Sequence, residues 1–436
     1  MNWDVQSPRM RCLVSLALLI GLSTTFVAPA EADEGARSTP PPLSLEDRLG
    51  GDRDAYRGRD PLGGSADIGT QIRFDAEPKQ AWIRRSLLQR WFDWKACVQK
   101  RIGLAWQLNY NVLTMHATDS LGEDEATGGV LELNATWDLV NRHSPNKGTL
   151  GFRVESRHKL GTKIAPAALG GELGTLWRPD VLWSERDLSL SQLWWEQRFL
   201  NGRGAVRFGK LITPAVIYDN FLLRVPQFAI QNEAFTFSAT PFPDNGLGVV
   251  AAVFPTERLY VLGGIHDANA FIEESGFDTV DDGEYFKALE LGWTPAFDKR
   301  KTDNVHVTLW HVDELEESGR PEGWGGTFSA QRYLCDRWLP FARYSYAAND
   351  VVPIEHLAQG GLGYRVRDHD SVALGVSYGT PSDGDLRSQW GLEIYYRAYV
   401  TQAISIIPGL QMFWNPSRNP EDDQITLFSL RTRLSL

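Results

Sequence analysis

The sequence has few cysteines, no long apolar run after its N-terminal leader and no excess of positive charge. Its three cysteines are Cys12, Cys97 and Cys335. Cys12 falls in an N-terminal leader, so the other two could form at most one disulfide, and their spacing matches no metal motif. After the leader, no apolar run approaches the roughly 20 residues that a membrane helix needs. The formal net charge of −11 excludes general nucleic-acid binding, which requires a basic surface.

Catalytic motifs are also missing. The sequence contains no Gly-x-Ser-x-Gly elbow, no His-Glu-x-x-His pair and no phosphate-binding glycine loop. His306 and His311 fall on opposite faces of one predicted strand and cannot share a metal. Carboxylate pairs such as Glu273-Glu274 lie in polar turns rather than in a setting that tunes a catalytic acid. We therefore expect no enzyme activity, no cofactor and no metal.

The N-terminus carries an export signal. Arg9 and Arg11 precede the apolar run Leu13 to Val27, and small-residue cleavage sites follow, so residues 1–30 are predicted to be a signal peptide. Residues 31–95 are predicted to be a linker rich in Pro, Gly, Asp and Arg that ends in a short amphipathic helix near Trp91 and Trp94. That helix could cap the mouth of a barrel, pack within the chain or serve as a periplasmic interaction helix.

From residue 96 to 436 the dominant pattern is alternation. In the last segment Phe428, Leu430 and Leu434 share one face, while Arg431 and Arg433 share the other. A strand that is apolar on one face and charged on the other fits a barrel wall between lipid and water. About sixteen such segments follow one another, an even number that suits a bacterial barrel. The expected strands lie near 104–112, 131–138, 150–157, 189–199, 203–212, 246–254, 258–267, 284–293, 304–313, 323–334, 337–347, 357–367, 371–378, 388–399, 402–414 and 424–436.

The fold class predicted from this pattern is all-β, a transmembrane antiparallel β-barrel of about 16 strands with a short N-terminal helical segment. Aromatic residues near the strand ends suit girdles at the two lipid headgroup layers. The segment Thr213 to Asn232 breaks the alternation and is too apolar for a freely solvated loop. It could fold inward and narrow the lumen, or form an ordinary external loop.

Several short motifs, in order along the chain, carry a family resemblance. They are Ser189 to Gln197, Phe208-Gly209-Lys210-Leu211, Tyr218-Asp219-Asn220, Asn232-Glu233-Ala234-Phe235, Asp244 to Gly248, Glu393-Ile394-Tyr395-Tyr396, Ile406 to Gln411 and Asn415-Pro416. Together they resemble the carbohydrate-selective porin (OprB-like) family over about Trp94 to Leu436. The resemblance is looser at Gly50-Gly51-Asp52-Arg53 and at Leu436, where such barrels usually end in Phe.

The resemblance implies a bacterial outer-membrane porin that passes small sugars by facilitated diffusion. Its expected partners besides sugars are outer-membrane lipid, lipopolysaccharide and the barrel-assembly machinery, with no nucleic acid. A monomer and a homotrimer both fit the resemblance. Inward guanidinium groups suit sugar hydroxyls. The candidate pore-lining residues are Arg153, Glu155, Arg157, Arg207, Tyr218, Asp219, Asn220, Arg343, Glu393 and Arg397.

Two alternatives to a sugar-selective porin remain at the level of sequence. A ring of arginines could equally select anions, which would make the barrel a general or anion-selective porin. The alternative from a different class is an exported soluble β-protein that binds or hydrolyses polysaccharide. Such a protein would place its apolar strand faces inward and its charges in bulk solvent.

Overall fold

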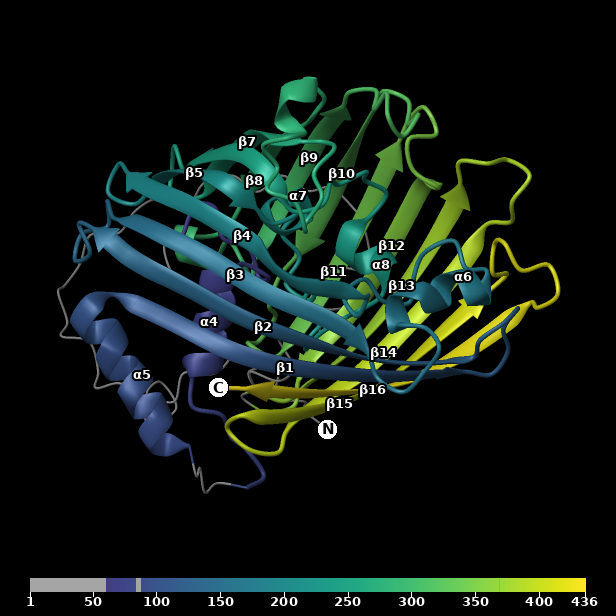
Figure 1. Cartoon of the computed structure of the whole chain (residues 1–436), viewed down its shortest axis with the longest axis horizontal. Helices are drawn as coiled ribbons and strands as arrows, with labels where there is room; N and C mark the ends of the chain where they lie inside the picture. The colour runs from purple at the N-terminus through teal and green to yellow at the C-terminus, as the bar shows by residue number, and fades with distance from the viewer. Residues whose placement is uncertain (1–59, 84–87, 368) are drawn as a thin grey trace, which may run out of the picture.

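Among the residues described in the computed structural model, which are 60–83, 88–367 and 369–436, sixteen antiparallel strands close into a barrel (Figure 1). Each strand pairs with the next one along the chain, and β1 pairs with β16 to complete the ring. Closure leaves no strand edge with unpaired backbone groups, which is the requirement for crossing a bilayer with strands. The predicted all-β barrel is confirmed.

The strands are β1 (Leu104–Ala117), β2 (Glu125–Val140), β3 (Gly148–Lys159), β4 (Arg186–Phe199), β5 (Gly204–Leu211), β6 (Gly246–Val253), β7 (Leu259–Asp267), β8 (Tyr285–Trp293), β9 (Asn304–Val312), β10 (Gly323–Gln331), β11 (Trp338–Ala347), β12 (Ile354–Arg365), β13 (Ser371–Pro381), β14 (Gln389–Tyr399), β15 (Ile404–Trp414) and β16 (Gln424–Ser435). The α-helices in the described residues are α4 (Ile68–Ala76), α5 (Gln89–Ile102), α6 (Leu169–Leu173), α7 (Pro214–Ile217) and α8 (Glu233–Phe237). Short 3-10 turns occupy Pro166–Ala168, Val280–Asp282 and Phe297–Lys299.

Alternation along each strand separates an outward apolar face from an inward polar face. On β16, Phe428 and Leu430 are each 50% exposed, while Arg431 and Arg433 are buried on the opposite side. The β1–β16 register places Arg433 beside Asn111, so polar residues also meet across the closing pair. This arrangement is the reverse of a soluble β-sandwich, in which the apolar face would be inside.

The two ends of the barrel differ. We call the end where β1 begins and β16 stops the proximal end, and the opposite end the distal end. Segments 160–185 and 212–245 follow the odd-numbered strands β3 and β5, so both start at the distal end. The second of them does not stay outside. It enters the lumen, where its buried apolar side chains join those of α4 and of the barrel wall in one hydrophobic core.

The N-terminal part differs from the predicted linker. Residues 31–59 and the predicted signal peptide lie outside the described residues, but from Asp60 to Asp75 nearly every residue is buried inside the barrel, and this stretch includes most of α4. The Asp67 side chain caps this helix by accepting a hydrogen bond from the Gly69 N–H at 3.0 Å. The segment is ordered because its carboxylates meet basic side chains of the barrel wall.

The predicted amphipathic helix is present but displaced toward the C-terminus. It forms α5 (Gln89–Ile102), and therefore runs past the predicted limit at residue 95. Gly103 ends it with a left-handed φ of 79°, and a side chain there would approach the Asp138 carbonyl oxygen to 2.8 Å. No helix in the described part of the chain has the length and apolar content needed to cross a membrane.

Candidate pore constriction

The segment from Thr213 to Asn245 narrows the lumen. Its prolines, among them Pro214 at the start of α7, interrupt strand pairing, and its apolar side chains turn inward to avoid water. Phe221, Phe228 and Phe235 are almost completely buried, and the Phe221 ring lies 4.7 Å from the ring of Phe341 on β11. The structure therefore has the inward-folded loop and excludes the alternative of a solvated external loop.

Buried charges fix this segment to the barrel wall. Asp219 accepts hydrogen bonds from Arg343 of β11 and from Arg224 within the loop, the latter at 3.1 Å. His306 lies 3.2 Å from the other oxygen of the same carboxylate. Burial alone would raise the pKa of Asp219, but Arg343, His306 and Arg224 outweigh it and hold that pKa well below its usual range.

The middle of the loop is attached to β14. Both carboxylate oxygens of Glu393 accept backbone hydrogen bonds at 3.0 Å, one from the N–H of Gln231 and one from the N–H of Asn232. Asn232 in turn caps α8 by accepting from the Ala234 N–H at 2.9 Å. Arg431 of β16 donates to the carbonyl oxygens of Pro226 and Ala229. Inward charges of the barrel thus satisfy backbone groups of the loop.

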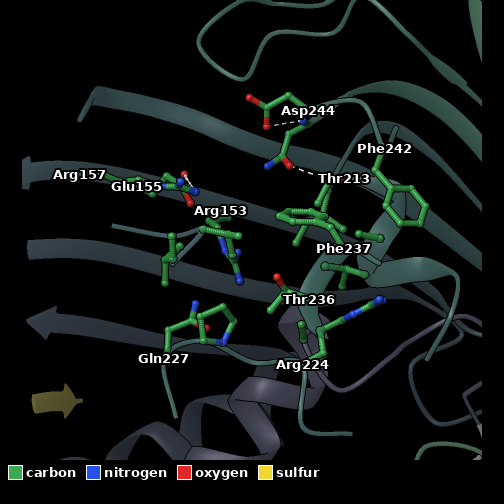
Figure 2. Close-up of a pocket in the computed structure, with 18 of the residues that line it drawn as sticks. Arg153, Glu155, Arg157, Thr213, Arg224, Gln227, Thr236, Phe237, Phe242 and Asp244 are labelled. Atoms are coloured by element: carbon green, nitrogen blue, oxygen red, sulfur yellow. Dashed lines mark hydrogen bonds and ion pairs between the residues drawn. The ribbon is translucent and has the colours of Figure 1, made fainter. Parts of the chain in front are cut away.

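A cavity of about 290 Å³ remains between the loop and the β3 side of the wall. Figure 2 shows Arg153, Glu155 and Arg157 of β3 on one side, with Phe237 and Phe242 of the loop on the other. The two phenyl rings are 6.5 Å apart and tilted by 48°. Flat apolar faces therefore stand opposite a row of hydrogen-bond donors, an arrangement that suits a sugar ring with polar edges and apolar faces.

The guanidinium groups of the cavity all have carboxylate neighbours. Their closest N–O distances are 3.7 Å for Arg153 to Glu132, 2.7 Å for Arg157 to Glu155, 2.6 Å for Arg178 to Glu233, 2.9 Å for Arg186 to Asp244 and 3.1 Å for Arg224 to Asp219. The cavity is rich in N–H donors, yet its positive charges are balanced locally. A lining of this kind favours neutral polyhydroxy solutes over anions, because an anion would compete with carboxylates that are already in place.

The N-terminal segment contributes to the same cavity. Ala66 and Gln71 line it, and the Gln71 side-chain oxygen accepts a hydrogen bond from Arg153 at 3.4 Å. Asp67 accepts from Arg207 of β5 at 2.7 Å. At the other end of α4, Asp75 receives two hydrogen bonds from Arg433 of β16, at 2.7 and 2.6 Å.

A second cavity of about 200 Å³ lies toward the proximal end along the same part of the wall. Its lining includes Asp67, Gly69 and Arg73 of the N-terminal segment, with Glu196 and Arg207 from the strands. Because α4 and the residues before it contribute to both cavities, this segment stands between them. Any solute that passes along this wall must pass α4.

The ten predicted pore-lining residues therefore fall into two groups. Arg153, Glu155 and Arg157 line the larger cavity. The others hold lumen segments in place. Arg207 holds the N-terminal segment, Tyr218, Asp219, Asn220 and Arg343 fix the first part of the loop, and Glu393 and Arg397 fix its middle part. Sequence reasoning missed Arg224, Phe237 and Phe242 as lining residues, because all three lie in the irregular loop.

No cluster of three His, Cys, Asp or Glu side chains within residues 60–83, 88–367 and 369–436 is arranged to hold a metal ion. Cys97 is a free, exposed thiol on α5, so it does not pair with Cys335.

Comparison with known proteins agrees with this architecture. The family model of the carbohydrate-selective porin, OprB family, matches residues 122–436, so the chain belongs to that family. The protein is a sugar-selective outer-membrane porin, a channel rather than an enzyme. No curated protein sequence matches it significantly.

Two solved structures show the same fold. Pseudomonas putida OprB at high pH superposes with a TM-score of 0.65 at 16% identity, covering 79% of this chain and 97% of that one. The low-pH structure of the same protein gives a TM-score of 0.50 at 15% identity, covering 80% and 98%. The TM-scores establish that the barrel fold is shared. The soluble β-protein alternative is wrong, because the apolar strand faces point outward.

Proposed function

We propose that neutral saccharides cross the barrel through the cavity between β3 and the inward loop. Donors from Arg153, Arg157 and Arg224 bind sugar hydroxyls, and the rings of Phe237 and Phe242 contact the apolar face of the sugar. The observation that carries this proposal is the donor-rich cavity whose guanidinium groups each lie beside a carboxylate. Binding is weak by necessity, since a permeating solute must also leave.

The proposal is tested by single-channel conductance of the purified protein in a planar bilayer. Glucose, maltose and an inert solute of matched size are titrated on one side. Saturable block by sugar, weakened in the Phe242→Leu variant, is the expected result, since leucine keeps the apolar volume but lacks the flat ring. The exposed Asp350→Asn variant is the matched control and keeps the block unchanged. Equal effects of sugar and inert solute would overturn the sugar site.

The remaining expectations from the sequence belong to this proposal. Residues 1–30 direct export and are then removed, residues 31–95 include the lumen segment and the first half of α5, and residues 96–436 form the outer-membrane barrel. Lipopolysaccharide surrounds the barrel, and the barrel-assembly machinery inserts it. Mass spectrometry of protein extracted from outer membranes tests the first step, because the mature chain should begin near residue 31.

A further inference from the structure

Helix α5 lies outside the barrel, against a strand face that points away from the lumen. Trp106 is on the outward face of β1, and the rings of Trp91 and Trp94 pack against it with centroid distances of 5.1 and 5.8 Å. Figure 1 shows α5 beside the start of β1, at the proximal end of the barrel. The chain thus leaves the lumen at the proximal end and turns back along the outside of the barrel.

Several contacts fix this position. The indole N–H of Trp137 on β2 donates to the Ile102 carbonyl oxygen at 3.0 Å, which ties the C-terminus of α5 to the wall. Lys95 donates to the carbonyl oxygen of Leu436, the last residue, at 2.8 Å, and its ammonium lies 4.9 Å from the centre of the Trp106 ring. The helix is therefore held at the level where β1 starts, β2 ends and the chain stops.

That level is the proximal edge of the lipid-facing wall. Outward tryptophans occur there on other strands as well, for example Trp293 at the end of β8 and Trp338 at the start of β11, which are 40% and 37% exposed. Such rings sit among lipid headgroups in membrane barrels. Trp137, which binds α5, is 38% exposed and belongs to the same band. The C-terminus of the helix consequently lies in the headgroup layer.

The exposed surface of α5 combines apolar and basic residues. No residue of α5 is buried, Trp94 is 51% exposed and Ile102 is 47% exposed. Arg90, Lys100 and Arg101 are exposed beside them. With Lys95 the helix carries four basic residues against the single acidic Asp93, in a chain whose net charge is −11.

We propose that α5 is a membrane-surface helix that binds the phospholipid headgroup layer at the proximal end of the barrel. Trp94 and Ile102 insert at the boundary of the acyl chains, while Arg90, Lys100 and Arg101 bind lipid phosphates. Two observations select lipid as the occupant of this face. The basic helix complements anionic headgroups, and the face is continuous with the apolar wall that already contacts lipid. The inference goes beyond sugar passage and does not depend on the sugar site.

The native thiol of Cys97 provides the test, because it is exposed on the same helix. A nitroxide label on Cys97 in the full chain, reconstituted into bilayers, is probed with oxygen, which concentrates in lipid, and with a water-soluble nickel chelate. The ratio of oxygen accessibility to nickel accessibility should be several-fold higher at Cys97 than at Ser318, an exposed residue of a distal loop. The Ser318 label is attached to a Ser318→Cys variant that also carries Cys97→Ser. Adding anionic phosphatidylglycerol to a zwitterionic bilayer should raise the ratio at Cys97 further.

The triple variant Arg90→Gln, Lys100→Gln, Arg101→Gln should lose the response to anionic lipid while its barrel stays folded and its sugar block stays unchanged. A label at Cys97 that is as accessible to the nickel chelate as the Ser318 control would overturn the proposal. A label shielded from both reagents would indicate a protein neighbour and would also overturn it. An accessibility ratio at Cys97 that is high but does not rise with anionic lipid would contradict the part of the proposal in which the basic side chains bind lipid phosphates.

Discussion

Inward arginines of this barrel have two different roles, which are decided by what each side chain touches. Arg153 and Arg157 face open space in the cavity, whereas Arg343 and Arg431 are enclosed by the loop and donate to its oxygens. Removing an enclosed arginine leaves buried acceptors without a partner, while removing a cavity arginine takes away a donor for a solute. Substitutions at the two kinds of position should therefore give different phenotypes.

The first prediction concerns a cavity arginine. Arg157→Gln keeps a hydrogen-bonding side chain but loses the charged donor, so the affinity of sugar block should fall by about ten-fold, as expected for one charge-assisted hydrogen bond worth about 1.5 kcal/mol. Open-channel conductance should change little. The measurement is sugar titration of single channels, with Arg258→Gln in an exposed proximal turn as the control. An unchanged sugar affinity would assign Arg157 to the wall and not to the site.

The second prediction concerns an enclosed charge. Asp219→Asn leaves Arg343 and Arg224 without their shared carboxylate, and breaking a buried pair in this way costs about 3–5 kcal/mol. The loop should loosen, so single-channel conductance should rise and become noisier, and limited proteolysis should cut between residues 213 and 245. Asp350→Asn removes an exposed carboxylate at the distal end and is the control. Conductance equal to that of the wild type would show that the loop is held by its apolar contacts alone.

At the scale of elements, α4 depends on carboxylates for its position. Burial by itself raises the pKa of Asp75, but Arg433 outweighs this effect, so the pKa of Asp75 lies below its ordinary value of 3.8. A carboxyl group with a lowered pKa stabilises the folded arrangement above that ordinary value and loses this contribution as the pH falls through the lowered pKa. Asp67 behaves in the same way beside Arg207.

The third prediction follows from the lowered pKa of Asp75. The contribution of α4 to channel conductance should be the same at pH 7 and pH 5, and should change only below about pH 3.8 as α4 loosens. The Asp75→Asn variant should show the low-pH behaviour at pH 7, while Asp385→Asn, an exposed loop position, should not. A conductance change centred between pH 5 and 7 would point to a different titrating group.

The sequence predicts strands well and lumen segments poorly, for a physical reason. The strand pattern is local, because simple alternation places Phe428 and Leu430 toward lipid and Arg431 toward the lumen. All sixteen expected strands are present among the described residues. The position of α4 depends on Arg207 and Arg433, which are distant in the chain, so composition alone predicts a linker. The sequence does contain a local signal of α4, because Asp67 stands at a helix N-cap position before the apolar residues Ile68 and Ile72.

The roles of side chains are harder to predict than whether they point into or out of the barrel. Alternation correctly places Arg343, Glu393 and Arg397 inside the barrel, where all three are buried. It cannot show that an irregular loop would cover them. The lining residues Phe237 and Phe242 lie on that loop, where no periodicity indicates which side chains face open space.

At the scale of the whole molecule, charge is distributed unevenly between the two ends of the barrel. The distal segment 268–284 carries six carboxylates and no Lys or Arg, and the distal segment 313–322 carries five with one arginine. Proximal turns are basic by comparison, for example Arg332 and Arg337 between β10 and β11. The acidic distal mouth should attract cations and repel anionic solutes over about 8 Å at physiological salt.

The fourth prediction concerns this distal field. In a salt gradient the channel should be cation-selective despite the arginines of its cavity, and acidic sugars should enter more slowly than neutral ones, most of all at low ionic strength. The variant Glu273→Gln, Glu274→Gln, Asp281→Asn, Asp282→Asn should shift the reversal potential toward zero and leave block by glucose unchanged. Anion selectivity of the wild-type channel would favour the anion-selective alternative and contradict this reading.

The pair between Asp75 and Arg433 joins residues 358 positions apart. The N-terminal segment is synthesised among the first residues of the chain, yet the side chain that holds it belongs to the last strand. Contacts this distant in sequence form late, because the chain between them must be ordered first. Assembly of the barrel must therefore proceed with the lumen still unoccupied or loosely filled, and α4 docks as the ring closes. The first segment of the described chain is thus among the last to reach its place.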